Sequence, residues 1–145
     1  MSVFFWDARV YWEDTDGGGI VYYANYLRYL ERARTEWLRS LGFHQHAFAA
    51  ETGLVFIVTH VNIDYRRPAR LDDALRITCE PFAEGRATLA FKQKIFREPW
   101  DASDTSGEVL LVDAETRVAC IDAKTHRPQR LPPFITNALS AKEST

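Results

Sequence analysis

Apolar residues recur along this chain with two different periods, a strand period towards each end and a helical period between them. Residues 3–12 are rich in Val, Tyr, Phe and Trp, which predicts a strand. Residues 21–43 predict one long helix, with Asn25 as a candidate N-cap and Gly42 as the residue that stops it. The expected buried stripe of this helix follows helical spacing and consists of Leu27, Leu30, Ala33, Trp37, Leu38 and Leu41.

From Gly53 onward the alternation has a period of two, which is typical of strands. One face of the first of these strands is expected to carry Val55, Ile57, Val61, Ile63 and Tyr65. The opposite face is expected to carry His60, Asn62 and Asp64. Three more strands are expected at 74–82, 86–97 and 108–122, with a long hairpin loop at 98–107. A short helix after Pro132–Pro133 and a polar tail over about 140–145 complete the chain.

The order of elements is therefore a strand, a long helix and four strands, in one domain over residues 1–145. Strands joined by short links are expected to pair antiparallel. A single helix cannot cover both faces of such a sheet, so the sheet is expected to wrap around it in an α+β fold. This arrangement leaves a sheet edge and an open flank, which predicts a dimer.

Composition narrows the class of protein. With 145 residues, of which 46% are hydrophobic, the chain can bury a core. It has no apolar run near the ~20 residues that cross a bilayer, and its start lacks the features of a signal peptide. A net charge of −2 without a basic run argues against nucleic acid as the main partner. Cys79 and Cys120 lie in strand-like segments and are expected to be buried thiols in a reducing compartment.

The segment EDTDGGG, between the first strand and the helix, carries the most chemistry. Glu13, Asp14 and Asp16 lie there beside three glycines and a helix start. Glycines let a backbone approach a ligand closely, and a helix start offers unpaired N–H groups with partial positive charge. Together with a carboxylate as base or nucleophile, these parts suit acyl transfer. Spacing alone leaves a second interpretation open, in which Asp14 or Asp16 only caps the helix.

Other kinds of site fit the sequence less well. A calcium loop is disfavoured because Gly18 and Asn25 replace two of the required ligands. The sequence also lacks the Lys of a phosphate-binding loop and the Gly-x-Ser-x-Gly of a serine hydrolase. The four histidines lack metal spacing, so no metal is expected. Arg66, Arg67 and Arg70 form a cluster that either contacts phosphates or is a solvated strand end.

Three segments resemble a known family. VYWEDTDGGGIVYYANYLRYLERARTEWLR is similar to the signature of the 4-hydroxybenzoyl-CoA thioesterase family, and most of all to its YbgC branch, the Tol–Pal-associated acyl-CoA thioesterases of bacteria. The segments VNIDYRRPARLDD and DAKTHRPQRLP resemble the same branch. The resemblance extends from Arg9 to about Pro133 and covers nearly the whole chain.

This resemblance implies a hot-dog fold, in which an antiparallel sheet wraps around the helix after Asn25. It implies hydrolysis of acyl-CoA by a homo-oligomer, either a dimer or a dimer of dimers (a homotetramer), without a cofactor because coenzyme A arrives with the substrate. The catalytic residues that it implies are Asp16 and Tyr23, and backbone N–H groups around Tyr22 and Tyr23 would polarise the thioester carbonyl. The substrate-binding residues that we assign with them are Gly19, Val21, Tyr22, Arg66, Arg67 and Arg70.

One residue departs from the branch. Many YbgC-type members carry His where this chain has Tyr23, whereas the hydroxybenzoyl-type branch carries Tyr. The change puts acyl preference and rate in question more than the reaction. Two alternatives stay open, a thioesterase that acts on acyl-carrier-protein thioesters and a non-catalytic partner of envelope or lipid-synthesis machinery. The branch also implies a cytoplasmic location, with the periphery of the inner membrane as an alternative.

Overall fold

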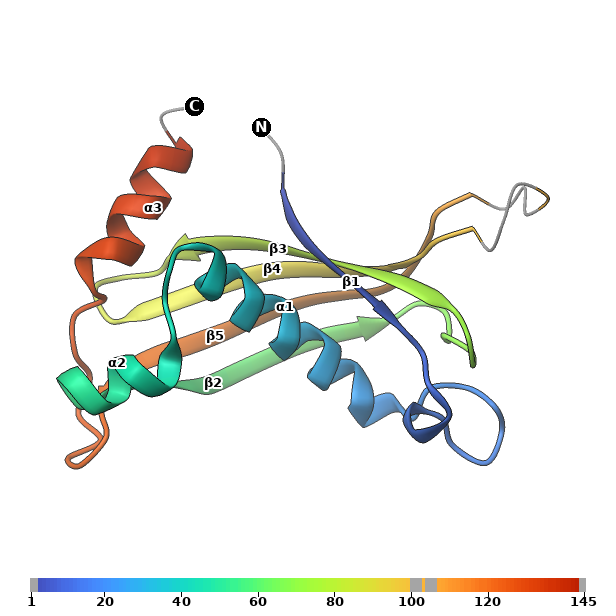
Figure 1. Cartoon of the computed structure of the whole chain (residues 1–145), viewed down its shortest axis with the longest axis horizontal. Helices are drawn as coiled ribbons and strands as arrows, with labels where there is room; N and C mark the ends of the chain where they lie inside the picture. Colours follow the sequence, from blue (N-terminus) through green and yellow to red (C-terminus); the bar gives the residue numbers. More distant parts are fainter. Residues whose placement is uncertain (1–2, 100–102, 104–106, 144–145) are drawn as a thin grey trace.

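A five-stranded antiparallel sheet forms the main layer of the protein, and a long helix crosses one of its faces (Figure 1). The computed structural model describes residues 3–99, 103 and 107–143. The strands are β1 (Phe4–Arg9), β2 (Leu54–Tyr65), β3 (Ala74–Ala83), β4 (Thr88–Arg97) and β5 (Val109–Asp122). Their order across the sheet is β1-β3-β4-β5-β2, so β1 and β2 are its edges. The predicted loop at 98–107 lies largely outside the described residues.

The long helix begins as a 3-10 turn, η2 (Tyr23–Asn25), and continues as α1 (Tyr26–Ser40). It buries Tyr26, Tyr29, Leu30, Ala33, Trp37 and Leu38. Leu27 and Leu41 were expected in this stripe but are exposed. Leu27 follows the buried Tyr26, so its side chain points ~100° away from the core side of the helix. Leu41 lies beyond the last turn of α1. Gly42 ends the helix with a φ of +83°, as predicted.

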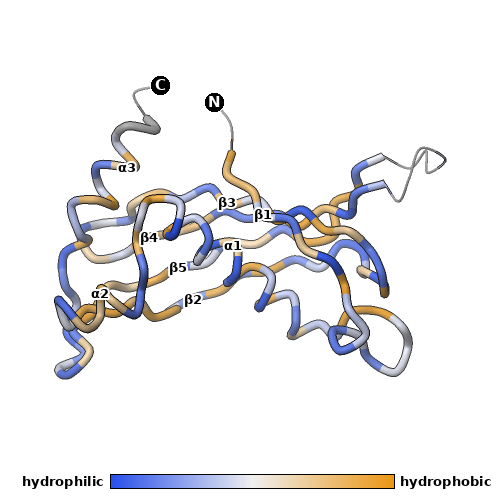
Figure 2. The backbone as a smooth tube through the Cα atoms, in the orientation of Figure 1, coloured by the Kyte–Doolittle hydropathy of each residue, from blue (hydrophilic) through white to orange (hydrophobic). Residues whose placement is uncertain are grey.

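The core lies between α1 and the inner face of the sheet. Hydropathy alternates along the strands, as the tube in Figure 2 shows, and each of the central strands β3, β4 and β5 turns one face to the helix. The helix contacts β1, β3 and β4. The buried strand residues on this face include Ile77, Phe91, Ile95 and Val112. One antiparallel sheet that curves around one central helix confirms the predicted α+β hot-dog fold.

The edge strand β2 contains a β-bulge just after Val58. Val58 lies opposite the buried Val118, and beyond the bulge Val61 lies opposite the buried Thr116. Directly opposed residues share a face, so Val58 and Val61 both face α1. The extra residue reverses the alternation, and the prediction of a single apolar face along the whole strand is therefore wrong, because Ile57 faces outward.

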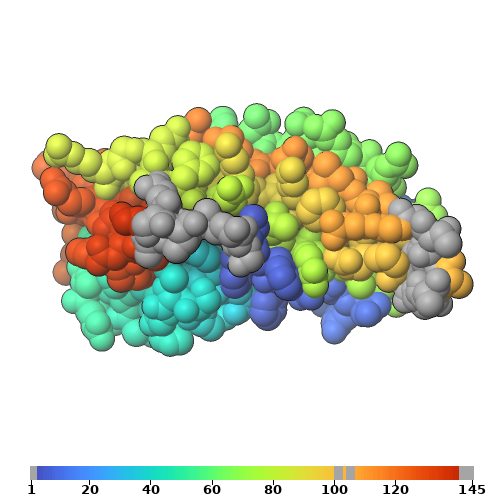
Figure 3. All heavy atoms as spheres, turned by 90° about the horizontal axis from the view of Figure 1, so that it is seen from above, coloured from blue at the N-terminus to red at the C-terminus, as the bar shows by residue number. Residues whose placement is uncertain are grey.

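Two further helices close one end of the fold. The sequence pattern does not predict α2 (Gln45–Thr52), whereas α3 (Pro133–Glu143) begins as expected and continues into the polar tail. Phe48 of α2 and Phe134 of α3 pack on Phe43, with ring centroids 4.6 Å and 4.8 Å from it. Seen from above, α3 (red) lies at one end of the molecule, opposite the β4–β5 hairpin (orange) at the other (Figure 3).

Both cysteines are buried and neither forms a disulfide among the described residues, which confirms the prediction of buried thiols. Burial raises the pKa of the Cys120 thiol, which disfavours its reactive thiolate form. Among the described helices, none combines the length and the apolar character needed to cross a membrane.

Candidate active site

The acidic, glycine-rich segment forms a small hairpin between β1 and the long helix. It follows a 3-10 turn, η1 (Trp12–Asp14). The Asp16 N–H donates to the Ile20 carbonyl at 2.8 Å, and the Tyr22 N–H donates to the Asp14 carbonyl at 3.1 Å. The three glycines occupy the tip of the hairpin. The chain thus turns back so that Asp16 lies across from the residues that lead into the helix.

Asp16 is exposed, and its carboxylate is held by its own turn. Its Oδ1 accepts the Gly18 N–H at 2.7 Å, while its Oδ2 accepts no hydrogen bond from the described residues. Gly19 has a φ of +79°, and a Cβ at Gly18 would lie 3.2 Å from Asp16 Oδ1, so the turn depends on both glycines. Asp16 accepts no N–H of the described helices, and the capping interpretation therefore does not hold for it.

Asp14 attaches the hairpin to the helix start. Its carbonyl accepts the Tyr22 N–H and also the side-chain amide of Asn25 at 2.9 Å. Its carboxylate accepts the Tyr11 N–H at 2.9 Å. Asn25 takes the N-cap position of α1, as we expected, but with φ −72° and ψ −19° it is itself helical and its side chain makes no capping hydrogen bond. Its side chain instead ties the helix start to the hairpin.

The helix start presents two unbonded N–H groups. The Tyr22 N–H, which we expected to face the substrate, is already bonded to Asp14. The amides of Tyr23 and Ala24 donate to no acceptor among the described residues. Because a helix start carries partial positive charge, these two amides can polarise an oxygen atom. The available donors therefore lie one residue further along the chain than expected.

Four tyrosines surround the helix start, and two of them, Tyr26 and Tyr65, were not predicted as site residues from the sequence. Tyr65, the last residue of β2, donates its hydroxyl to the Tyr23 carbonyl at 3.2 Å. The ring centroids of Tyr22 and Tyr23 are 5.0 Å apart, and those of Tyr26 and Tyr65 are 5.5 Å apart. An aromatic wall therefore flanks the two unbonded amides and reaches the edge strand.

Ala69 supports the site from the core side. Its carbonyl accepts the Val21 N–H at 2.9 Å, and its N–H donates to the Tyr26 hydroxyl at 2.9 Å. Val21, which we assigned to substrate binding, is 3% exposed and belongs to the core. Burial is the main cause that raises the pKa of the Tyr26 phenol.

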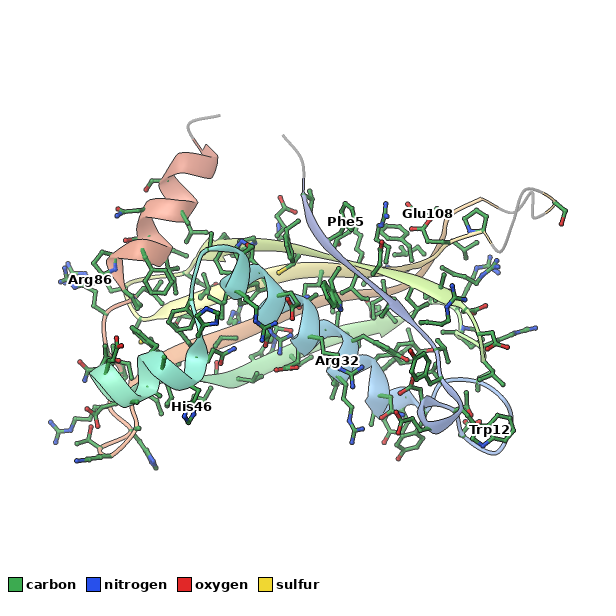
Figure 4. All side chains as sticks on the ribbon, viewed as in Figure 1. Phe5, Trp12, Arg32, His46, Arg86 and Glu108 are labelled. Carbon is green, nitrogen blue, oxygen red and sulfur yellow. The ribbon has the colours of Figure 1, made fainter. Side chains whose placement is uncertain are left out.

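Two of the three clustered arginines lie beside the hairpin. Arg70 pairs with Ile20 in an isolated β-bridge. Arg67 and Arg70 line a depression of about 790 Å³ together with Arg97. Glu108, labelled in Figure 4, lines it too. Arg97 was not foreseen, because only the pairing of strands distant in sequence brings it to this place.

Arg66 and His60 lie apart from the site. The Arg66 guanidinium lies 4.0 Å from the Asp64 carboxylate, and its side chain does not line the depression. His60 is exposed on the outer face of β2. Across the described ranges, no three His, Cys, Asp or Glu side chains gather as a metal site requires.

Comparison with known proteins fits the fold and the site. A family model described as the thioesterase-like superfamily matches residues 10–139. The chain belongs to this superfamily. The matched range contains the hairpin, the helix start and the arginines of the depression.

Relatives of this thioesterase-like chain match over nearly its whole length. The acyl-CoA thioester hydrolase YbgC of Escherichia coli O6:H1 is 42% identical, over 92% of this chain and 93% of that protein. The 1,4-dihydroxy-2-naphthoyl-CoA hydrolase of Nostoc punctiforme is 31% identical, over 94% and 86%. A solved 1,4-dihydroxy-2-naphthoyl-CoA thioesterase from Synechocystis superposes with a TM-score of 0.85 over 98% of both chains; at 23% identity this likeness establishes the fold alone. The resemblance to YbgC is confirmed.

Proposed function

We propose that this protein hydrolyses acyl-CoA thioesters to a carboxylic acid and coenzyme A, with Asp16 as the catalytic carboxylate. The observation that carries the proposal is an exposed carboxylate on a fixed hairpin next to two unbonded amides at the start of a long helix. Two of the relatives above are named for the hydrolysis of CoA thioesters, which supports the same reaction here.

The amides of Tyr23 and Ala24 would donate to the thioester carbonyl oxygen, on which negative charge develops during the reaction. Asp16 Oδ2 would either attack the carbonyl carbon or take a proton from an attacking water. In the first route the carbon–sulfur bond breaks as a mixed anhydride forms between the acyl group and Asp16, and water then hydrolyses this anhydride. In the second route water adds to the carbonyl carbon and the carbon–sulfur bond breaks directly. In both routes the coenzyme A thiolate leaves and takes up a proton, and one water molecule is consumed for each acid released. Coenzyme A enters as part of the substrate, so we propose no separate cofactor.

The replacement of Asp16 tests the assignment. Asp16→Asn should lower turnover of acyl-CoA by about 10²–10⁴-fold and leave thermal unfolding unchanged. Glu13→Gln, the same change on an exposed neighbour, should retain turnover. Near-normal turnover of Asp16→Asn would remove Asp16 from the mechanism. Oxygen-18 in the Asp16 carboxylate after repeated turnover in labelled water would identify the nucleophilic route, because hydrolysis of the anhydride at the Asp16 carbonyl leaves the label there and the general-base route never labels Asp16.

Tyr23 is proposed to act through its backbone amide, with its phenol in the wall of the acyl pocket. The side chain is 62% exposed, and the Tyr65 hydroxyl holds its carbonyl. Tyr23→Phe should therefore keep kcat. Tyr23→Pro removes the N–H at a first helical position, where proline is tolerated, and should lower kcat by about 10²–10³-fold. The reverse pattern, with Phe inactive and Pro active, would assign the role to the phenol.

Coenzyme A, rather than acyl carrier protein, is the carrier that we propose. Arg67, Arg70 and Arg97 line a depression next to the hairpin, and guanidinium groups bind phosphates through charge-assisted hydrogen bonds. The carrier protein shares the pantetheine arm but lacks the nucleotide phosphates of coenzyme A. Turnover of one acyl group on both carriers tests this choice, and a preference for the carrier protein would reverse it.

We further propose a dimer formed through β2. This edge strand has 12 residues and exposes Ile57, Val58 and Val61 at 43%, 51% and 38%. A long apolar edge is a template for a second strand, and a second copy satisfies it with twofold symmetry. Light scattering of the purified protein tests the dimer, and a monomer at micromolar concentration would refute it.

Resemblance to the YbgC branch supports two wider proposals, association with the Tol–Pal system and a cytoplasmic location that extends to the periphery of the inner membrane. Cross-linking in cells followed by purification tests the association, and cell fractionation tests the location. If this protein is instead a non-catalytic partner of envelope or lipid-synthesis machinery, it should bind its partner and hydrolyse no thioester of a broad panel.

A further inference from the structure

A small cavity lies between α1 and the sheet, beside the edge strand β2. Its volume is about 120 Å³. A water molecule takes up ~30 Å³ in the liquid, so the cavity has room for about four non-hydrogen atoms. Its apolar wall includes Phe56, Val58, Leu89, Phe91 and Val118. The guanidinium-bearing side chain of Arg34, from the middle of α1, forms part of the same wall.

Arg34 is held in one place on that wall. Its Nη1 donates to Gln93 Oε1 at 3.1 Å, and its guanidinium carbon lies 5.9 Å from the centroid of the Phe91 ring. Gln93 is 1% exposed, and its Nε2 donates to the Leu30 carbonyl at 3.0 Å. The bond to Leu30 fixes which end of the amide faces Arg34, so the guanidinium is anchored from the core side.

Arg34 forms no salt bridge with a carboxylate among the described residues. A guanidinium carries five N–H donors. Toward the described residues, Arg34 donates one hydrogen bond, and its acceptor is the neutral side chain of Gln93. Glu31, one turn away, lines the same cavity, accepts the Thr35 hydroxyl at 3.0 Å and favours the protonated form of Arg34. Burial lowers the pKa of Arg34, although an arginine stays protonated at neutral pH. A cation in such surroundings is stabilised only where acceptors meet its remaining donors.

The cavity is within reach of the proposed site. Tyr23 and Arg34 are eleven residues apart on one continuous helix, which corresponds to ~16 Å along its axis. Phe56 and Val58 lie in the first half of β2, while Tyr65 ends its second half beside Tyr23. Antiparallel pairing of two copies along β2 sets the first half of one strand beside the second half of the other. The cavity of one copy would therefore open towards the tyrosines of the second.

We propose that Arg34 is a specificity-determining residue that binds an oxygen-bearing group, such as a hydroxyl, oxo or carboxylate group, at the far end of the acyl chain. The apolar wall would hold the carbons next to that group, and the guanidinium would donate to its oxygen. This inference rests on the proposed thioesterase function and names the class of acyl group that the site prefers.

The test uses pairs of acyl-CoAs that have the same chain length and differ only in a terminal hydroxyl, over a series of lengths. At the lengths that reach the cavity, the wild-type protein should show a kcat/KM about 10- to 100-fold higher for the hydroxylated member. Arg34→Met, which keeps the volume and removes the donors, should bring this ratio close to one. Arg32→Met makes the same change on an exposed residue of the same helix, labelled in Figure 4, and should leave the ratio unchanged.

A wild-type ratio near one at every length would overturn the inference, whether or not a variant folds. An unchanged ratio in a folded Arg34→Met protein would also overturn it and leave Arg34 a purely structural residue. If Arg34→Met does not fold, Arg34→Leu also removes the charge and the donors, and an unchanged ratio in that variant overturns the inference as well. A wild-type protein that hydrolyses no acyl-CoA of the series refutes the proposed function itself, which is a distinguishable result.

Discussion

The side chain of Asn25 should control activity more than stability. It donates from the helix start to the Asp14 carbonyl at 2.9 Å, and so joins the helix to the hairpin that carries Asp16. Asn25→Ala removes this tie and leaves the backbone hydrogen bond from Tyr22 to Asp14 in place. We expect the helix to persist while the hairpin gains freedom relative to the amides of the helix start.

The magnitude follows from two opposing effects. The lost hydrogen bond should cost ~1 kcal/mol, because the Asp14 carbonyl keeps its bond from Tyr22 and is not left unsatisfied. Alanine in the helical conformation of Asn25 should recover ~0.5 kcal/mol through its higher helix propensity. The free energy of unfolding should therefore fall by only ~0.5 kcal/mol. The gain in helix propensity does not hold the hairpin in place, so the position of the hairpin loses the whole ~1 kcal/mol of the hydrogen bond. This energy corresponds to a loss of about fivefold in kcat/KM.

Steady-state release of free coenzyme A thiol gives kcat/KM, and urea unfolding gives the stability. Asn25→Asp keeps the shape of the side chain but sets a carboxylate against the Asp14 carbonyl, so it should lose more activity than Asn25→Ala. Asn137→Ala, on the exposed side of α3, serves as the control. If both Asn25 variants turn over like the wild type, the tie does not position the hairpin and the reasoning fails.

Three further predictions concern the same end of the molecule. Gly19→Ala puts a Cβ on a residue with φ +79°, so it should cost ~1–2 kcal/mol in urea unfolding and lower kcat by moving Asp16, whereas Gly17→Ala should be nearly neutral in both measurements. Arg67→Met should raise the KM for acyl-CoA more than the KM for a small thioester, and Arg66→Met should change neither; equal effects of Arg67→Met on both substrates would refute a phosphate contact. Burial, and next the Asp14 carboxylate, raise the pKa of Tyr29 above that of an unfolded tyrosine. The contribution of the neutral Tyr29 phenol to stability is therefore fully present below pH ~10 and is lost as the pH rises further. Between neutral and alkaline pH, the free energy of unfolding measured with urea should fall less in Tyr29→Phe than in the wild type.

The local parts of the fold and of the site could be predicted from the sequence. Asp16, its glycines and the long helix follow one another within a single segment, and their order alone places a carboxylate next to a helix start. The stop at Gly42 and the burial of the cysteines also follow from local chemistry. Spacing alone could not distinguish a catalytic Asp16 from one that only caps the helix. The resemblance to the family motif favoured the catalytic role.

The parts that escaped prediction depend on contacts between segments distant in sequence. The β-bulge after Val58 inserts one residue, and period-two counting cannot detect an insertion that keeps apolar residues at odd positions on both sides of it. Helix α2 is short and makes its main contact through Phe48, whose partner rings come from other elements. Arg97 joins Arg67 only after β4 has taken its place in the sheet. Register, rather than composition, decides each of these cases.

The edge strand and the candidate site cannot be considered separately. The Tyr65 hydroxyl bonds to the carbonyl of Tyr23, so the end of β2 holds the residue whose amide is proposed to polarise the thioester. In the single chain Asp16 and Tyr23 face water, where charges are screened and hydrogen bonds to a developing oxyanion contribute little. Acyl transfer benefits from donors in a site that excludes water. Pairing along β2 would cover this face with a second copy, so a monomeric variant should keep the hairpin and its hydrogen bonds and still lack the enclosure that the chemistry requires.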